Sequence, residues 1–114
     1  MIITNNPMVN NACHINGLIF IDGSLLDVLT AVRDYVHRGY TLQTHPLSGS
    51  VKPGETPYKT VVLESGESVC FKSLNIIEES ILTARKLTAD RNYTDKMLKD
   101  FQLIDHTLIF ERKN

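Results

Sequence analysis

The chain has 114 residues, 42% of them hydrophobic and 22% charged, with a formal net charge of −1. This length and composition are typical of one soluble globular domain, so we expect a single α/β domain over residues 1–114. A net charge so close to zero gives no electrostatic reason to expect nucleic acid or an anionic membrane as a partner.

The N-terminus lacks the basic and apolar segments of a signal peptide, and no apolar run approaches the ~20 residues that cross a bilayer. We therefore expect a cytoplasmic protein. Cys13 and Cys70 lie far apart, without CxxC spacing, and the four histidines are dispersed. The sequence predicts neither a metal site nor a cofactor.

The first half of the chain alternates short apolar runs with polar turns. Residues 1–4 and 18–21 have the pattern of strands, and the segment 8–17 between them is predicted to be a loop that could contain one helical turn. A helix is expected over 24–38, because Ser24 suits the N-cap, Asp27 follows at the third helical position, and Gly39 suits the end. The positions expected to face the core are Leu25, Val28, Leu29, Val32 and Val36.

The second half is predicted to contain two further strands, at 40–44 and 58–64, and two helices. Residues 69–71 fit a short strand or an extended segment. One helix is expected from Asn75, with Glu78 completing a capping box; its core-facing positions are Ile77, Ile81, Ala84 and Thr88. The other is expected from Thr94; its predicted buried stripe is Met97, Phe101, Ile104 and Leu108. Residues 107–110 fit either the end of this helix or a terminal strand.

This order predicts an α/β sandwich of two or three layers, with a mostly parallel sheet of about four strands and three helices. The helix at 24–38 connects two short strands, which is typical of a parallel βαβ unit. Ligands of open α/β sheets usually bind beyond the carboxyl ends of the strands. If the first strand is parallel to the next two, three polar clusters meet at that edge; if it is antiparallel, its cluster lies at the opposite edge.

These clusters supply the predicted ligand-binding residues, which are Thr4, Asn5, Asn6, Asp22, Ser24, His45, Ser48, Gly49, Ser50 and Lys52. The segment 44–60 is the richest in hydroxyl, backbone and cationic donors, a combination that suits a carboxylate or phosphate. It has neither a Walker loop nor a GxGxxG motif. The alternative is that its serines and glycines only form turns. Its span of residues 46–58 between strands is longer than an ordinary connection of ~4–6 residues.

Two other functions stay open on the sequence alone. His45 with Ser48 or Ser50 and Asp22 has the residue types of a hydrolase or transferase triad, although no GxSxG motif is present. The alternative for His45 is a strand-end residue that shapes the turn into Pro46. A third hypothesis is a homodimer assembled through the apolar C-terminal helix.

Three stretches are distinctive: TNNP at 4–7, DGSLLDVLTAVRDYVHRG at 22–39, and THPLSGSVKPGETPYKT at 44–60. Together they resemble the GrdX family, small proteins encoded alongside glycine reductase components in amino-acid-fermenting anaerobic bacteria. The resemblance covers at least the first 64 residues. It implies a cytoplasmic accessory protein of a reductase system, and it assigns no catalytic residue or cofactor. Together with the donor-rich segment 44–60 and the lack of a complete catalytic motif, this favours a non-catalytic protein that binds a small anionic ligand or a reductase-system protein.

Overall fold

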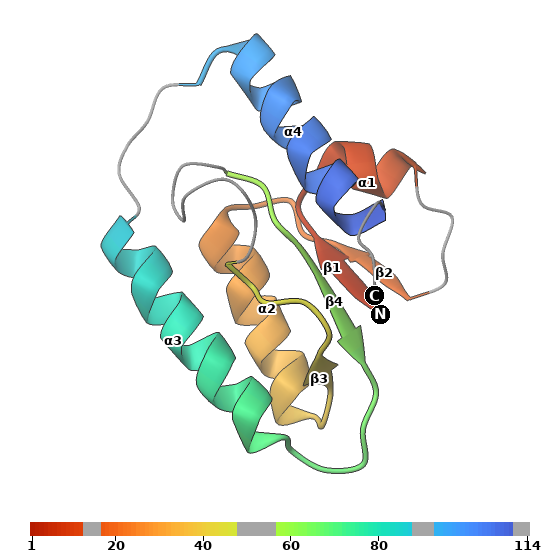
Figure 1. The fold of residues 1–114 in the computed structure, drawn as a ribbon, viewed down its shortest axis with the longest axis vertical. Helices are drawn as coiled ribbons and strands as arrows, with labels where there is room; N and C mark the ends of the chain where they lie inside the picture. The colour runs from red at the N-terminus through yellow and green to blue at the C-terminus, as the bar shows by residue number, and fades with distance from the viewer. Residues whose placement is uncertain (13–16, 48–56, 88–92, 111–114) are drawn as a thin grey trace.

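The computed structural model describes residues 1–12, 17–47, 57–87 and 93–110, and within them four strands and four helices (Figure 1). In chain order the elements are β1 (Ile2–Thr4), α1 (Pro7–Ala12), β2 (Leu18–Phe20), α2 (Leu25–His37), β3 (Thr41–Leu42), β4 (Thr60–Glu64), α3 (Phe71–Leu87) and α4 (Asp95–Phe110). The expected α/β class is confirmed. The count of three helices is wrong, because α1 forms where the sequence analysis placed a loop.

The four strands form one sheet in the order β2-β1-β4-β3. β1 pairs with β2 in parallel, with Ile3 opposite Ile19, and with β4 antiparallel, with Thr4 opposite Thr60. β3 also pairs with β4 antiparallel. The sheet is therefore mixed rather than mostly parallel. Because β4 runs against its neighbours, the strands β1, β2 and β3 point the same way, and β4 begins at the edge where they end.

The helices lie on both faces of this sheet, with α2 and α3 on one side and α1 and α4 on the other (Figure 1). Successive side chains of a strand point to opposite faces. Ile3, Val61 and Leu63 accordingly join the hydrophobic core with α2 and α3. Thr4 and Thr60 point to the other face, where Thr60 contacts α4. One face of the sheet is thus covered by an apolar core and the other by a more polar layer.

The signals that predicted α2 are all present in the structure. Ser24 accepts a hydrogen bond from the Asp27 backbone N–H, and the Asp27 carboxylate accepts one from the Ser24 N–H, which completes a capping box. The helix ends at His37, and Gly39 follows it with a φ of +104°, a conformation that side chains disfavour. The predicted core positions are all buried: Leu25, Val28, Leu29, Val32 and Val36.

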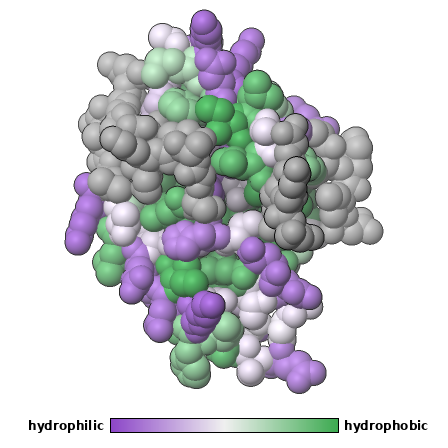
Figure 2. Space-filling model, viewed as in Figure 1, coloured by the Kyte–Doolittle hydropathy of each residue, from purple (hydrophilic) through white to green (hydrophobic). Residues whose placement is uncertain are grey.

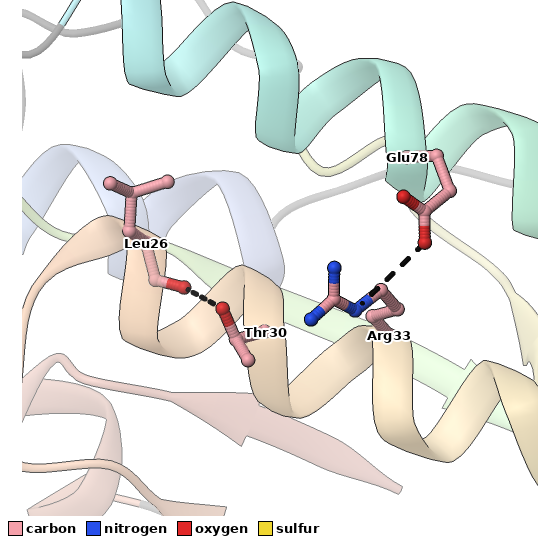
Figure 3. A network of polar contacts seen from close by, with 4 residues as sticks. All are labelled: Leu26, Thr30, Arg33 and Glu78. Atoms are coloured by element: carbon pink, nitrogen blue, oxygen red, sulfur yellow. Dashed lines mark hydrogen bonds and ion pairs between the residues drawn. The ribbon is translucent and has the colours of Figure 1, made fainter.

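α3 packs along α2 and begins earlier than its pattern indicated. Ile77, Ile81 and Ala84 are buried in the core, as expected. The helix starts at Phe71, so Asn75 lies inside it and the predicted capping box there is wrong. Figure 3 shows the polar rim of this contact, where Arg33 Nε of α2 lies 3.9 Å from Glu78 Oε1 of α3. This half-exposed ion pair contributes little to stability beside the apolar contact.

α4 continues to Phe110, so the terminal strand considered for residues 107–110 is not formed. Its predicted buried stripe is wrong, because Met97, Ile104 and Leu108 are 41%, 36% and 39% exposed. The helix turns Asp105 toward the sheet instead, and Asp105 is its buried residue. In Figure 2 hydrophobic surface gathers in the upper part of this face, where α4 runs in Figure 1.

None of the helices in the described part of the chain is long and apolar enough to span a membrane.

The apolar core on the α2 side makes a direct prediction about stability. Leu29 is fully buried, whereas Leu82 of α3 is 55% exposed. Leu29→Ala should lower the free energy of unfolding by about 2–5 kcal/mol, because it leaves a cavity in the core. Leu82→Ala, the matched control, should change it by less than about 0.5 kcal/mol. Urea denaturation followed by circular dichroism measures both values, and equal losses would contradict this placement of the core.

Candidate functional site

The polar segments that follow β1 and β2 meet at one edge of the sheet, where β4 begins. The Asn5 side chain connects them. Its Nδ2 donates to the backbone oxygens of Gly23, at 3.0 Å, and Pro57, at 2.8 Å. Its Oδ1 accepts from the Lys59 N–H at 2.9 Å. Because the first strand is parallel to the second, the segments TNNP and DGS lie together, as the parallel alternative predicted. Pro57 and Lys59 reach the same edge because β4 begins there, whereas the third predicted cluster, residues 45–50, is described only as far as Leu47.

A second polar cluster lies beside Asn5, on the face of the sheet that α4 covers. Asp105 of α4 accepts three hydrogen bonds: from the Thr60 N–H to Oδ1 at 3.1 Å, from the Thr60 hydroxyl to Oδ2 at 2.6 Å, and from Asn6 Nδ2 to Oδ2 at 3.0 Å. These three residues are all buried. Such bonds satisfy a carboxylate that would otherwise be costly to remove from water.

The donor and the acceptor can be assigned for each hydroxyl hydrogen bond of the cluster. Thr60 has one hydroxyl proton and gives it to Asp105, so in the 2.7 Å contact between the two threonine hydroxyls Thr4 is the donor. Thr4 Oγ1 also accepts from the Asn6 N–H at 3.0 Å, and Asn6 Oδ1 accepts from the Met8 N–H at 3.0 Å. The cluster therefore links β1, β4, the start of α1 and α4.

Lys59 is buried at the same edge, with 8% of its surface exposed. Burial away from water lowers the pKa of its ammonium group, and the negative charge of Asp105 opposes this effect. The charged form of Lys59 is thus destabilised in the folded chain, and Asp105 provides part of the compensation.

The predicted site residues fall into three groups. Thr4, Asn5, Asn6 and Ser24 use their side chains in hydrogen bonds within the protein. Asp22 and His45 are exposed. Residues 48–52, which include the predicted donors Ser48, Gly49, Ser50 and Lys52, lie outside the described residues.

His45 shapes the turn that follows it, as the alternative interpretation proposed. Its Nδ1 accepts a hydrogen bond from the Leu47 N–H at 3.1 Å, and Pro46 between them is buried. The serines of the hypothetical triad lie outside the described residues, so the enzyme hypothesis stays a prediction from residue types.

Sequence reasoning missed the residues that complete the edge. From the sequence, Lys59 and Thr60 are expected only as part of a strand, and Asp105 has no predicted role. The signal was present in the spacing: Leu98, Gln102, Asp105 and Ile109 form a second stripe, one position away from the apolar one. Gln102 contributes twice, since its backbone oxygen accepts from Asn6 Nδ2 at 2.9 Å and its side chain donates to the Tyr58 hydroxyl at 2.9 Å.

An open groove of about 450 Å³ runs between α1 and α4 beside this cluster. It is lined by Pro7, Met8, Asn11 and Gln102. Two amides in an otherwise apolar lining give the groove little charge of its own.

Cys70 is partly exposed immediately before α3, and its backbone oxygen accepts from the Leu74 N–H. A hydrogen bond with the Ser73 side chain is the main cause of a lowered thiol pKa. In the described part of the chain, no three of the side chains His, Cys, Asp and Glu gather as metal ligands would.

The family model of GrdX-like proteins matches residues 1–112. The chain belongs to the GrdX-like family. The match spans both the TNNP and DGS segments and α4, so Asn5 and Asp105 both lie within the family's extent. No curated protein and no solved structure matches the chain.

The lowered pKa of Lys59 makes stability depend on pH. Between that pKa and the usual 10.5 of the unfolded chain, the unfolded state binds more protons, so the free energy of unfolding should rise with pH. We expect the free energy of unfolding of the unmodified chain, minus that of Lys59→Met, to increase as the pH rises toward 10.5. Urea denaturation at each pH measures it. For Lys72→Met, which removes an exposed lysine, the same free-energy difference should not change with pH. An equal increase with pH for both variants would contradict the assignment of the effect to Lys59.

Proposed function

We propose that this GrdX-like protein is a cytoplasmic, non-catalytic accessory protein of amino-acid reductase systems such as glycine reductase. It binds a small anionic ligand, or a protein of that system, at the edge formed by the segment 44–60. The observation that carries the proposal is the Asn5 side chain, whose amide bonds to Gly23 and Pro57. It brings the end of that segment to the edge where open α/β sheets usually bind ligands.

The polar chemistry of this edge supports binding rather than catalysis. Asn5, Asn6 and Asp105 are hydrogen-bonded to the chain itself and hold the strand ends, so they do not point into solvent as acids, bases or nucleophiles. Binding capacity then rests on the segment's own donors, since hydroxyl groups and an ammonium group are typical partners of carboxylates and phosphates. The link to reductase systems rests on the family resemblance.

This proposal predicts that the donors of the segment control anion affinity. The triple variant Ser48→Ala, Ser50→Ala, Lys52→Ala should weaken binding of inorganic phosphate at least about tenfold, because each charge-assisted hydrogen bond contributes roughly 1.5–3 kcal/mol. Isothermal titration calorimetry measures the affinity, and circular dichroism verifies the fold.

The matched control carries the same substitutions at exposed positions elsewhere: Ser65→Ala, Ser68→Ala and Lys72→Ala. It should bind phosphate as the unmodified chain does. Unchanged affinity in the first triple variant, or an equal loss in the control, would reject the segment as the binding site.

A specific observation also favours a homodimer. Met97, Ile104 and Leu108 are exposed, and with the half-buried Phe101 they repeat at intervals of four, three and four residues. This is the spacing by which two identical helices interdigitate their side chains. We propose that two copies of α4 pair along this stripe.

If α4 pairs with a second copy, the unmodified chain should show twice the 12.9 kDa mass of one chain in light scattering after size exclusion. Ile104→Lys should shift it to the monomer, because it places a charge in the apolar seam. Leu103→Lys, at a position 54% exposed on another side of the helix, is the control and should stay dimeric. A monomer at high concentration would exclude this arrangement.

A further inference from the structure

We propose that Thr60 and Asn6 form a carboxylate-binding site that the chain fills with its own Asp105. α4 is then an internal occupant, and a carboxylate from outside the chain can take the place of Asp105. This site includes Thr60, the last residue of the segment 44–60, but none of the donors Ser48, Ser50 and Lys52, and it does not depend on ligand binding by them.

The geometry of the donors is that of a carboxylate receptor. The Thr60 N–H donates to one oxygen of the carboxylate, while the Thr60 hydroxyl and Asn6 Nδ2 donate to the other, all within 2.6–3.1 Å. Both oxygens are held, so the plane of the group is fixed as well as its position. The charge of Asp105 also acts on the nearby Lys59, so the surroundings favour an anion.

The donors are held in place in part by contacts that do not involve α4, although Asn6 Nδ2 also donates to the Gln102 backbone oxygen of that helix. Thr60 pairs with Thr4 across the β1–β4 ladder, and the Thr4 hydroxyl also reaches Thr60 Oγ1. Asn6 is fixed by its N–H, which donates to Thr4 Oγ1, and by its Oδ1, which accepts from the Met8 N–H. A site whose donors are already oriented loses little free energy in binding a new occupant.

The side chain that α4 buries fully is polar, while its apolar residues Leu98, Phe101 and Ile109 are only half-buried, which makes exchange feasible. Asp105 is its buried residue, whereas α2 buries five apolar side chains in the core. The exposed large apolar side chains of α4 are Met97, Leu103, Ile104, Leu108 and Phe110. A helix without a fully buried apolar side chain can leave the sheet more easily than a core helix can.

The test removes the carboxylate of Asp105 and supplies it again from solution. Asp105→Ala lacks only the carboxylate beyond Cβ, and formate is the missing fragment. We expect about 0.3 M formate to raise the thermal midpoint of this variant by at least about 4 °C more than that of the unmodified chain. Sodium chloride at the same ionic strength corrects for general salt effects. If the variant is unfolded, recovery of its circular dichroism signal on adding formate is the equivalent result.

Two controls separate the site from a general effect of the anion. Asp105→Asn also removes the charge but leaves no space, so formate should not stabilise it. Adding Thr60→Val to Asp105→Ala removes one donor and should abolish most of the formate effect. Equal stabilisation of all variants, or an alanine variant that stays unfolded in formate while the asparagine variant folds, would overturn the proposal.

A parallel titration of Asp105→Ala with N-acetyl-aspartate amide distinguishes two sources of the carboxylate. Stabilisation by formate alone assigns the site to small free acids. Stabilisation by both probes extends it to aspartate side chains presented on a peptide. Failure of both rejects the site, whatever the phosphate titration of the 44–60 segment shows.

Discussion

Thr60 lies opposite Thr4 because β4 runs antiparallel to β1, and the polar contacts at this end of the sheet follow from that register. The pairing places two hydroxyls in contact and directs the Thr60 proton to Asp105. A register shift of one residue would turn Thr60 toward the α2 side, where Val61 now fills the apolar core. The same pairing therefore fixes the hydrophobic core, the position of α4 and the predicted ligand edge.

The two faces of the sheet are stabilised in different ways. On the α2 side, close packing of apolar side chains provides the free energy, and each buried methylene group contributes roughly 0.8 kcal/mol. On the α4 side, buried hydrogen bonds satisfy Asn6, Thr60 and Asp105, and their net contribution is about 1 kcal/mol each. The described residues leave no buried side-chain polar atom without a partner. On the α4 side, the buried polar groups thus have hydrogen-bond partners, but apolar packing contributes little free energy. This agrees with the exposed apolar side chains of α4.

The sequence predicted local features better than distant ones. α2 could be predicted with its cap, its end and its core positions, because Ser24, Asp27 and Gly39 act within a few residues of each other. The direction of β4 could not be predicted, because a connection as long as residues 46–58 allows the next strand to run parallel or antiparallel to the sheet. The predicted buried face of α4 was wrong for a related reason. Its sequence has two stripes at helical spacing, and only Thr60 and Asn6, distant in sequence, decide that Asp105 faces inward.

The choice of a carboxylate at that inward position is not explained by stability alone. Buried polar networks of this kind can often be replaced by apolar side chains of similar volume with little loss, or a gain, of stability. An apolar stripe was available on the same helix, one position away. A carboxylate instead requires Thr60 and Asn6 to meet it in one arrangement, so it fixes the rotation of α4 about its axis. Under our proposal it also leaves the bond exchangeable, because another carboxylate offers the same two oxygens to Thr60 and Asn6.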